Sequence, residues 1–162
     1  MIPIDLGNAT VRYLEAQDHV AYIAMEKNAE IKQYVGGPSN RTEQDLLSSL
    51  RNYSPCTSLL VVADSETNTF IGRCGLLEKR GSLEVELYIL LTQTHLRKGI
   101  ARVVVPFLVR LAAANGKVAV AYVDSANQAS LKLLERIGAI SDGTNTDSGY
   151  QVNHIRYIFT ST

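Results

Sequence analysis

Three residues, Arg97, Lys98 and Gly99, form a polar loop directly before an apolar segment with helical spacing, and no Ser, Thr, Asp or Asn caps the junction. The first backbone N–H groups of a helix have no partner within the helix, and the helix dipole favours an anion beside them. The two basic side chains add positive charge, and the glycine lacks a Cβ that would keep an anion away. The sequence therefore predicts a phosphate-binding loop.

The same loop also allows a simpler interpretation, in which the glycine only eases the start of the helix and the basic side chains are solvated. It lacks the second glycine of a GxGxxG motif and the GxxxxGK[ST] pattern, so neither a dinucleotide nor a nucleoside triphosphate is predicted. Cys56 and Cys74 have no CxxC spacing and no accompanying histidine cluster. Buried thiols are therefore favoured over redox chemistry or a metal site.

The composition of the chain indicates which class of protein contains this loop. The chain has 162 residues, of which 46% are hydrophobic and 20% charged, and sixteen basic residues balance sixteen acidic ones. These values predict one globular domain over residues 1–162, and the balanced charge disfavours nucleic acid or membrane partners. No segment approaches the ~20 apolar residues of a membrane span, and residues 1–17 lack a basic segment followed by a long apolar run, so a cytoplasmic location is expected.

The pattern of apolar residues predicts a mixed α/β order around the loop. The expected helices cover residues 17–35, 42–53 (capped by Asn40 or Thr42), 99–115 and 127–138. The expected strands cover residues 9–16, 58–64, 70–79, 83–91, 117–124 and 149–160. The helix over 99–115 carries Pro106, for which we expect a bend. As a long crossover, this helix allows the strands before and after it to lie parallel, whereas the three strands before it are antiparallel.

Two consecutive segments resemble conserved blocks of the GNAT superfamily of N-acetyltransferases. The segment "LEVELYILLTQTHLRKGIARVVV" resembles the block with the loop R/Q-x-x-G-x-G/A, and "VDSANQASLKLLERIGA" resembles the next block. The resemblance covers nearly the whole chain and is nearest to the branch that acetylates ribosomal-protein N-termini. It implies a central, mostly antiparallel sheet of six to seven strands, about four helices and a splayed parallel strand pair. It also implies an acyltransferase that moves an acetyl group from acetyl-CoA to a primary amine in a ternary complex.

The resemblance further implies which residues bind the cofactor in a cleft between the parallel strands. Backbone groups of residues 89–91 would pair with the pantetheine arm, the amides of residues 97–102 would bind the diphosphate, and two residues of the next helix would lie near the thiol. The implied cofactor residues are Ile89, Leu90, Leu91, Leu96, Arg97, Lys98, Gly99, Ile100, Ala101, Arg102, Asn127 and Ser130. Asn127 and Ser130 can equally be an ordinary helix cap and first-turn residue.

Glu86 is the expected general base. An ammonium has no lone pair, so acetyl transfer needs a group that removes a proton from the amine. Counted back from Gly99, Glu86 falls where relatives carry a glutamate, and alternation puts Glu84, Glu86 and Tyr88 on one strand face. Mutual repulsion of the two glutamates can raise one pKa if they are partly buried. Solvated, outward-facing glutamates are the alternative, and this alternative is stronger for Glu84.

Other parts of the chemistry are expected from backbone groups. An amide near Ile89 or Leu90 can stabilise the oxyanion. Cys74 has no recognisable histidine partner, so a covalent intermediate is disfavoured. His19, His95 and His154 are left out of the catalytic set.

Two departures from the family pattern leave a second function open. Leu96 replaces the usual Arg or Gln, and Leu134 replaces a tyrosine that protonates the leaving thiolate in many members. A catalytically weak CoA-binding or regulatory module is therefore the alternative to an enzyme. The acceptor amine, whether protein N-terminus, lysine, polyamine or antibiotic, is not identified by the sequence. Residues 34–40 and 141–154 are expected at its rim, with Asp142 and Asp147 favouring a cation, and a homodimer is a common default.

Overall fold

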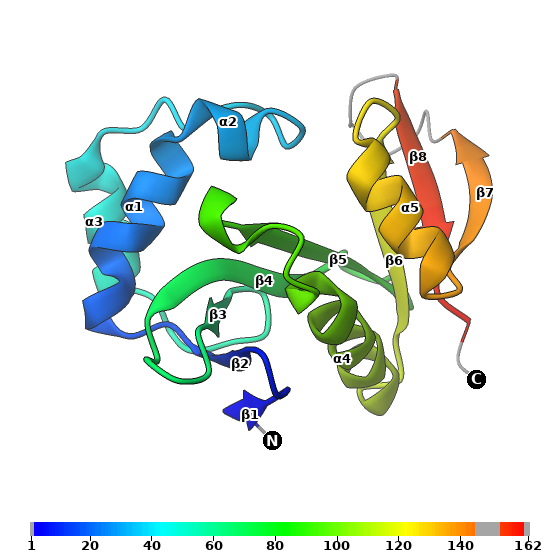
Figure 1. Cartoon of the computed structure of the whole chain (residues 1–162), viewed down its shortest axis with the longest axis horizontal. Helices are drawn as coiled ribbons and strands as arrows, with labels where there is room; N and C mark the ends of the chain where they lie inside the picture. The colour runs from blue at the N-terminus through cyan, green and yellow to red at the C-terminus, as the bar shows by residue number, and fades with distance from the viewer. Residues whose placement is uncertain (1, 145–152, 161–162) are drawn as a thin grey trace. The chain divides into compact units, whose positions relative to one another are not determined.

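The computed structural model describes residues 2–144 and 153–160. Within them, eight strands follow the order β1-β2-β3-β4-β5-β6-β8-β7 (Figure 1). Two compact units divide the chain: Met1–Gly75 with Ile89–Ile100, and Leu76–Tyr88 with Ala101–Thr162. The expected mixed, mostly antiparallel sheet with one parallel pair is confirmed.

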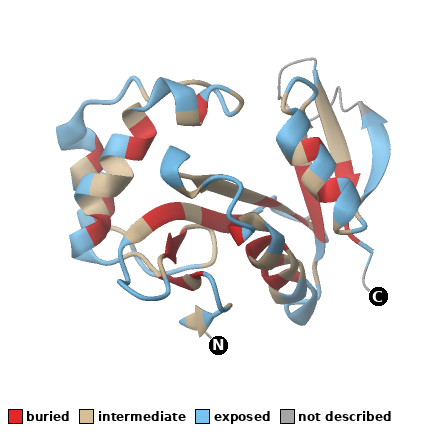
Figure 2. Ribbon diagram, viewed as in Figure 1, coloured by how far each residue is buried: buried red, intermediate tan, exposed pale blue. Residues whose placement is uncertain are grey.

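The first unit carries β1 (Ile4–Asp5), β2 (Thr10–Tyr13), β3 (Leu60–Ala63) and most of β4 (Phe70–Glu78). Consecutive members pair antiparallel. All four residues of β3 are buried, as expected for a continuous apolar strand that is covered on both faces. Figure 2 shows this burial on β3.

The helices of the first unit differ in one respect from the expectation. The predicted helix over 17–35 is instead a 3-10 turn, η1 (Ala16–Asp18), followed by α1 (His19–Lys27) and α2 (Ala29–Lys32). The break occurs because Asn28 has extended geometry (φ −81°, ψ 112°) and its side chain accepts a hydrogen bond from the Ile31 amide at 2.9 Å, starting α2 anew. Val20 on α1 is 81% exposed, whereas Met25 is buried.

The third helix, α3 (Glu43–Arg51), begins as predicted. Thr42, not Asn40, is its N-cap: the Thr42 hydroxyl accepts from the Asp45 amide at 3.1 Å, and the Asp45 carboxylate accepts from the Thr42 amide at 3.3 Å. This reciprocal capping box satisfies two amides that the helix itself leaves open.

The second unit contains the parallel strand pair. Strand β5 (Glu84–Leu91) pairs with β6 (Val118–Asp124) in the register Glu84↔Val118 to Glu86↔Val120. Helix α4 (Ile100–Ala114) is the crossover between them, as predicted. Pro106 lies inside α4, and the bend expected there stays a prediction.

The rest of the second unit is α5 (Gln128–Arg136), β7 (Ile140–Thr144) and β8 (His154–Ile158). Strand β8 pairs antiparallel with both β6 and β7, and α5 lies across β6 and β8 (Figure 1). The closing strand expected over 149–160 is thus present in its described part, and residues 145–152 lie outside the described residues. The total of eight strands exceeds the expected six to seven because β1 and β7 are added.

In residues 2–144 and 153–160, no helix combines the length and the apolar character that a bilayer crossing requires.

Candidate active site

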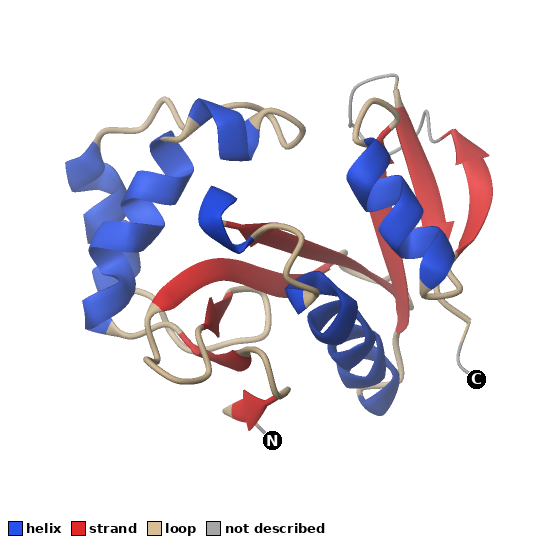
Figure 3. Ribbon diagram, in the orientation of Figure 1, coloured by secondary structure: helices blue, strands red, loops and turns tan. Residues whose placement is uncertain are grey.

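The loop between β5 and α4 has the backbone geometry of an anion-binding turn. The 3-10 turn η2 (Gln93–His95) follows β5, and the chain then reaches α4 through a short loop (Figure 3). Arg97 has φ 61° and Gly99 has φ 77°. A left-handed residue alternating with others makes successive N–H groups converge, which forms a concave anion-binding nest. For Arg97, a non-glycine residue, this conformation costs energy and is typical of functional loops.

Asn8 holds this loop from a distant part of the sequence. The Asn8 side-chain amide donates to the Lys98 carbonyl at 3.3 Å. Asn8 is presented by the turn between β1 and β2, in which the Leu6 amide donates to the Ala9 carbonyl at 2.9 Å and the Gly7 amide donates to Asp5 Oδ1 at 2.8 Å. A bond to the carbonyl of Lys98 turns that peptide group and so helps fix the direction of the following amide.

The loop side chains are open to solvent. Arg97, Lys98 and Arg102 are exposed, and among the described residues none of the three forms an ion pair. Leu96 is 45% exposed. Ile100 is buried and anchors the first turn of α4. The basic charge at the loop is therefore available to an anion.

Backbone alternation in β5 selects which of its groups face away from β4. The Leu90 carbonyl points at β4, since a Cβ built on Gly72 would lie 2.3 Å from it, and the Thr92 amide donates to the Ile71 carbonyl at 2.9 Å. Neighbouring residues of a strand direct their N–H and C=O groups to opposite edges. The N–H and C=O groups of Ile89 and Leu91 therefore face the edge opposite β4.

Glu86 lies on the face of β5 that the sequence predicted. Val85 and Leu87 are buried, whereas Glu84, Glu86 and Tyr88 are partly exposed. In the second unit, Glu84 and Glu86 line a cavity of about 520 Å³. Its volume lies in the range that holds a small ligand.

Arg156 neutralises part of the acidic charge on this face. Its guanidinium forms ion pairs with Glu84 and with Asp142. Burial lowers the pKa of Arg156, but hydrogen bonds to Glu84 and Tyr122 raise it by more, so the pKa lies above its ordinary value. Glu84 is thus held by a cation, which offsets the negative charge on which the predicted repulsion between Glu84 and Glu86 depends. Asp142 is likewise paired, and Asp147 lies outside the described residues.

Asn127 and Ser130 take up the capping role that the sequence left open. Asn127 is the N-cap of α5, and its Oδ1 accepts from the Ser130 amide at 3.2 Å. The Asn127 Nδ2 group is a remaining donor, so a ligand role stays a prediction. Leu134 is buried on α5 and supplies no polar group there.

The two cysteines and His95 are each buried or hydrogen-bonded to neighbouring side chains. Cys74 is fully buried, and burial raises the pKa of its thiol to about 12, so it stays protonated. The expectation of a buried thiol was wrong for Cys56, which is exposed, and a hydrogen bond with Ser58 at 2.9 Å lowers the pKa of its thiol. His95 Nδ1 shares hydrogen bonds with Thr92 and Thr94. Within the described residues, no group of three or more His, Cys, Asp or Glu side chains is arranged to hold a metal ion.

The candidate residues divide between the two units. The first contains Ile89, Leu90, Leu91, Leu96, Arg97, Lys98, Gly99 and Ile100, and the second contains Glu86, Ala101, Arg102, Asn127 and Ser130. Sequence reasoning missed Asn8 and Arg156. Neither has a local signal, because each reaches its partner only after strands distant in sequence have paired.

The family model described as "Acetyltransferase (GNAT) domain" matches residues 8–140. The chain therefore belongs to the GNAT acetyltransferase family, and it is an acyltransferase. The family match does not assign the chain to the branch that acetylates ribosomal-protein N-termini.

Solved structures agree on the fold. An acetyltransferase from Agrobacterium tumefaciens str. C58 superposes with a TM-score of 0.79 at 22% identity, covering 99% of this chain and 95% of that one. Spermidine N-acetyltransferase from Vibrio cholerae, in complex with CoA and spermine, gives 0.78 at 19% identity, with 93% and 94% covered. A Salmonella typhimurium protein, described as a candidate acetyltransferase with its cofactor acetyl-CoA, gives 0.68 at 19% identity, with 94% and 92% covered. No curated protein matches the sequence.

Proposed function

We propose that the chain transfers an acetyl group from acetyl-CoA to a primary amine by direct attack, with both substrates bound. The observation that carries this proposal is the loop at the start of α4, where two left-handed residues, Arg97 and Gly99, and unpaired basic side chains suit a diphosphate. CoA and acetyl-CoA, which two of the structural neighbours contain, carry such a diphosphate. The residues present thus fit the cofactor that the family uses.

Each group has a definite task in the proposed reaction. The Ile89 carbonyl and the N–H and C=O groups of Leu91 pair with the pantetheine arm, because they face away from β4. Glu86 removes a proton from the acceptor ammonium, directly or through water, which gives the amine its lone pair. The amine nitrogen then forms a bond to the acetyl carbon, and the carbon–sulfur bond breaks to release CoA thiolate. The second proton that the nitrogen loses as the amide forms passes through water and balances the proton that the thiolate takes up. The Ile89 amide stabilises the oxyanion.

The buried, protonated Cys74 supports direct attack over a covalent intermediate. The leaving thiolate takes its proton from water or from Ser130, because Leu134 supplies no acid. The family match spans both units, which supports residues 1–162 acting as one acetyl-CoA-binding domain. The ribosomal N-terminal branch remains a proposal that rests on the "VDSANQASLKLLERIGA" segment.

A catalytically weak CoA-binding module is the second candidate, and the exposed Leu96 and buried Leu134 favour it. Glu86→Gln separates the two functions. For an enzyme, this variant loses acetylation of amines, measured by mass spectrometry, and retains the rise in melting temperature that CoA produces. The exposed Glu135→Gln on α5 is the matched control and keeps both properties. Absence of acetylation by the natural sequence, with CoA binding retained, favours the module instead.

A further inference from the structure

Protonation of the leaving thiolate is the step of the proposed reaction for which Leu134, buried and apolar, supplies no acid. Water can donate this proton, but a phenol is a stronger acid than water by roughly five to six pKa units. A tyrosine in the cavity that Glu86 lines would therefore be the better donor. Tyr122 on β6 lines that cavity.

Tyr122 lies on the same face of the sheet as Glu86. The parallel register joins Glu84 of β5 to Val118 of β6 and Glu86 to Val120, and residues two apart on a strand share a face. Tyr122 comes two positions after Val120. Since Glu86 and Tyr122 also line the same cavity of about 520 Å³, a substrate bound there has both side chains beside it.

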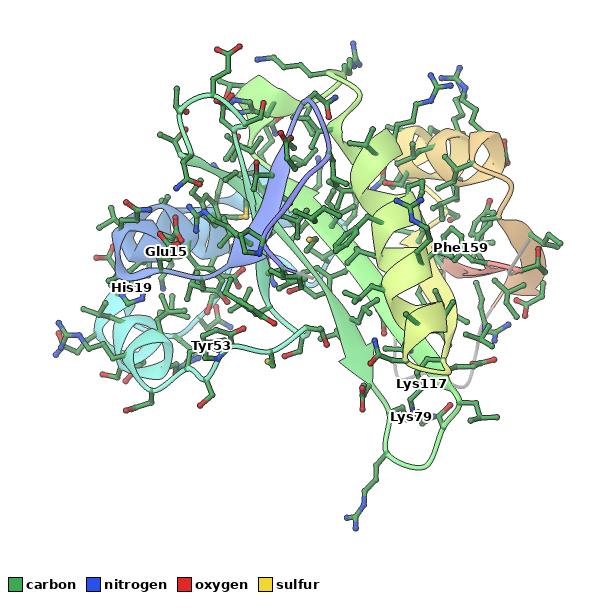
Figure 4. All side chains as sticks on the ribbon, turned by 90° about the horizontal axis from the view of Figure 1, so that it is seen from below. Glu15, His19, Tyr53, Lys79, Lys117 and Phe159 are labelled. Atoms are coloured by element: carbon green, nitrogen blue, oxygen red, sulfur yellow. The ribbon has the colours of Figure 1, made fainter. Side chains whose placement is uncertain are left out.

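Tyr122 also lies just beyond the paired part of β5 and β6. The two strands are tied together at their other end, where the Lys117 ammonium donates to the Ser82 carbonyl at 3.0 Å. Figure 4 shows Lys117 and Lys79 at this end. Among the described residues, the register of β5 with β6 ends at Glu86↔Val120. Tyr122 is therefore the first residue on this face of β6 where main-chain pairing between the two strands does not exclude a substrate.

Arg156 on β8 supports the loss of the Tyr122 proton. The two residues are direct partners in the antiparallel register of β6 with β8. A hydrogen bond joins their side chains, and Arg156 also pairs with Glu84 and Asp142. A guanidinium only donates, so the phenol oxygen accepts this bond and the bond does not consume the phenol proton. Because the bond strengthens as negative charge develops on the oxygen, it stabilises the phenolate that Tyr122 becomes.

From this geometry we infer that Tyr122 is a catalytic residue: its phenol gives a proton to the CoA thiolate as the carbon–sulfur bond breaks, in place of water or Ser130. Arg156 is a positioning residue that acts through Tyr122. The inference rests on the proposed function, because it assigns one step of the same reaction.

The protons of this step balance. The sulfur keeps the electron pair of the broken bond and binds the proton from Tyr122. The second proton of the acceptor nitrogen passes through water to the phenolate, which restores Tyr122. Glu86 releases the first proton of the ammonium to solvent at the end of the cycle.

Tyr122→Phe tests the inference, because it removes the hydroxyl and keeps the ring. The acceptor is Ala-Val-Ala, Nα-acetyl-lysine amide or spermidine, whichever the natural sequence acetylates with the highest kcat/KM, and the product is measured by mass spectrometry. We expect kcat to fall about 100-fold, as for loss of a general acid, while the rise in melting temperature that CoA produces is retained. Tyr13→Phe removes the hydroxyl of another half-buried tyrosine, on β2, and is the matched control that keeps kcat.

A pH profile separates proton donation from a structural role. On the strands beside β6, the titratable and charged side chains that share this face are Glu84, Glu86, Tyr88, Asp142, His154 and Arg156. Of these, only Tyr88 is a second phenol, so the phenol at position 122 is changed by itself. The reaction requires protonated Tyr122, so kcat falls at high pH. Tyr122→3-fluorotyrosine, with a more acidic phenol, moves this fall to lower pH.

A double-variant comparison tests the role of Arg156. Arg156→Gln lowers kcat in the natural sequence, because the phenolate loses its hydrogen bond. In the Tyr122→Phe background the same change has little effect on kcat, because the two residues act as a unit. Equal effects in both backgrounds contradict the positioning role.

The outcomes separate this inference from the proposed function. An unchanged kcat in Tyr122→Phe, or a pH profile that 3-fluorotyrosine leaves in place, overturns Tyr122 as the acid and leaves the acetyltransferase activity standing. A fall in kcat together with loss of the CoA-induced thermal stabilisation also overturns it, since Tyr122 then serves folding or binding. If the natural sequence acetylates none of the three amines, the proposed function is overturned together with the inference.

Discussion

Replacing Gly99 with alanine tests whether the left-handed loop binds the diphosphate. A Cβ at Gly99 meets only Asn8 Nδ2, at 3.6 Å, which is an ordinary contact, so the substitution adds no clash. Its effect is on the backbone: at φ 77° an L-residue is disfavoured by roughly 1–2 kcal/mol relative to glycine. If the free loop of the variant relaxes and the CoA-bound loop requires the left-handed conformation, this energy is lost from the free energy of CoA binding. CoA affinity then falls about 5- to 30-fold.

Isothermal titration calorimetry with CoA measures this change, and Gly116→Ala is the control. Gly116 follows α4 and also has a left-handed φ, 67°, with no atom within 4 Å of an added Cβ. Gly116→Ala lowers the melting temperature of the free protein, because it places alanine in the left-handed region. Only Gly99→Ala is expected to weaken CoA binding. An unchanged dissociation constant for Gly99→Ala, with the melting temperature lowered as in the control, would refute the loop assignment.

Three further outcomes are expected. Asn8→Ala removes one hydrogen bond to the loop and weakens CoA binding about fivefold in calorimetry, as a bond worth about 1 kcal/mol predicts; Asn52→Ala, which removes a bond from a side-chain amide to a carbonyl at the end of α3, does not. In the folded protein, an alkylating reagent labels the exposed Cys56 and not the buried Cys74. Mass spectrometry of the intact, folded Cys56→Ser variant therefore finds no added alkyl group. Burial is the main cause that raises the pKa of Tyr53 from 10.0 to about 12. The folded protein therefore holds the hydroxyl proton more tightly than the unfolded chain does. The stability that this contributes is complete below pH ~10 and is lost as the pH rises toward 12. Tyr53→Phe therefore flattens the alkaline decline in the free energy of unfolding, measured with urea; an unaltered decline contradicts this role.

The fold was predictable where the signal is periodic or local. The β-branched runs, the alternation around Glu86 and the helix end at Gly138 (φ 82°) depend on neighbouring residues, and the structure has them where expected. The prediction of one helix over 17–35 was wrong because Asn28 can cap a new helix as readily as it can continue the old one. Spacing alone does not separate these two roles of an asparagine.

The candidate site was predictable only in its contiguous parts. Gly99 and its basic neighbours form a local pattern, so the loop was found from the sequence. Arg156 lies 72 positions from Glu84 and Asn8 lies 90 positions from Lys98, so only pairing of the strands brings these groups together. The availability of a charge at the site therefore depends on tertiary partners that sequence spacing does not reveal.

The alternation of backbone groups along β5 has a consequence for how freely the chain can change. Under the proposed function, Ile89 and Leu91 present main-chain atoms to pantetheine, and every amino acid except proline supplies the same atoms. Substitution of these two side chains by other strand-forming residues would leave cofactor recognition intact. Gly72 has no such freedom, since any side chain there would collide with the Leu90 carbonyl.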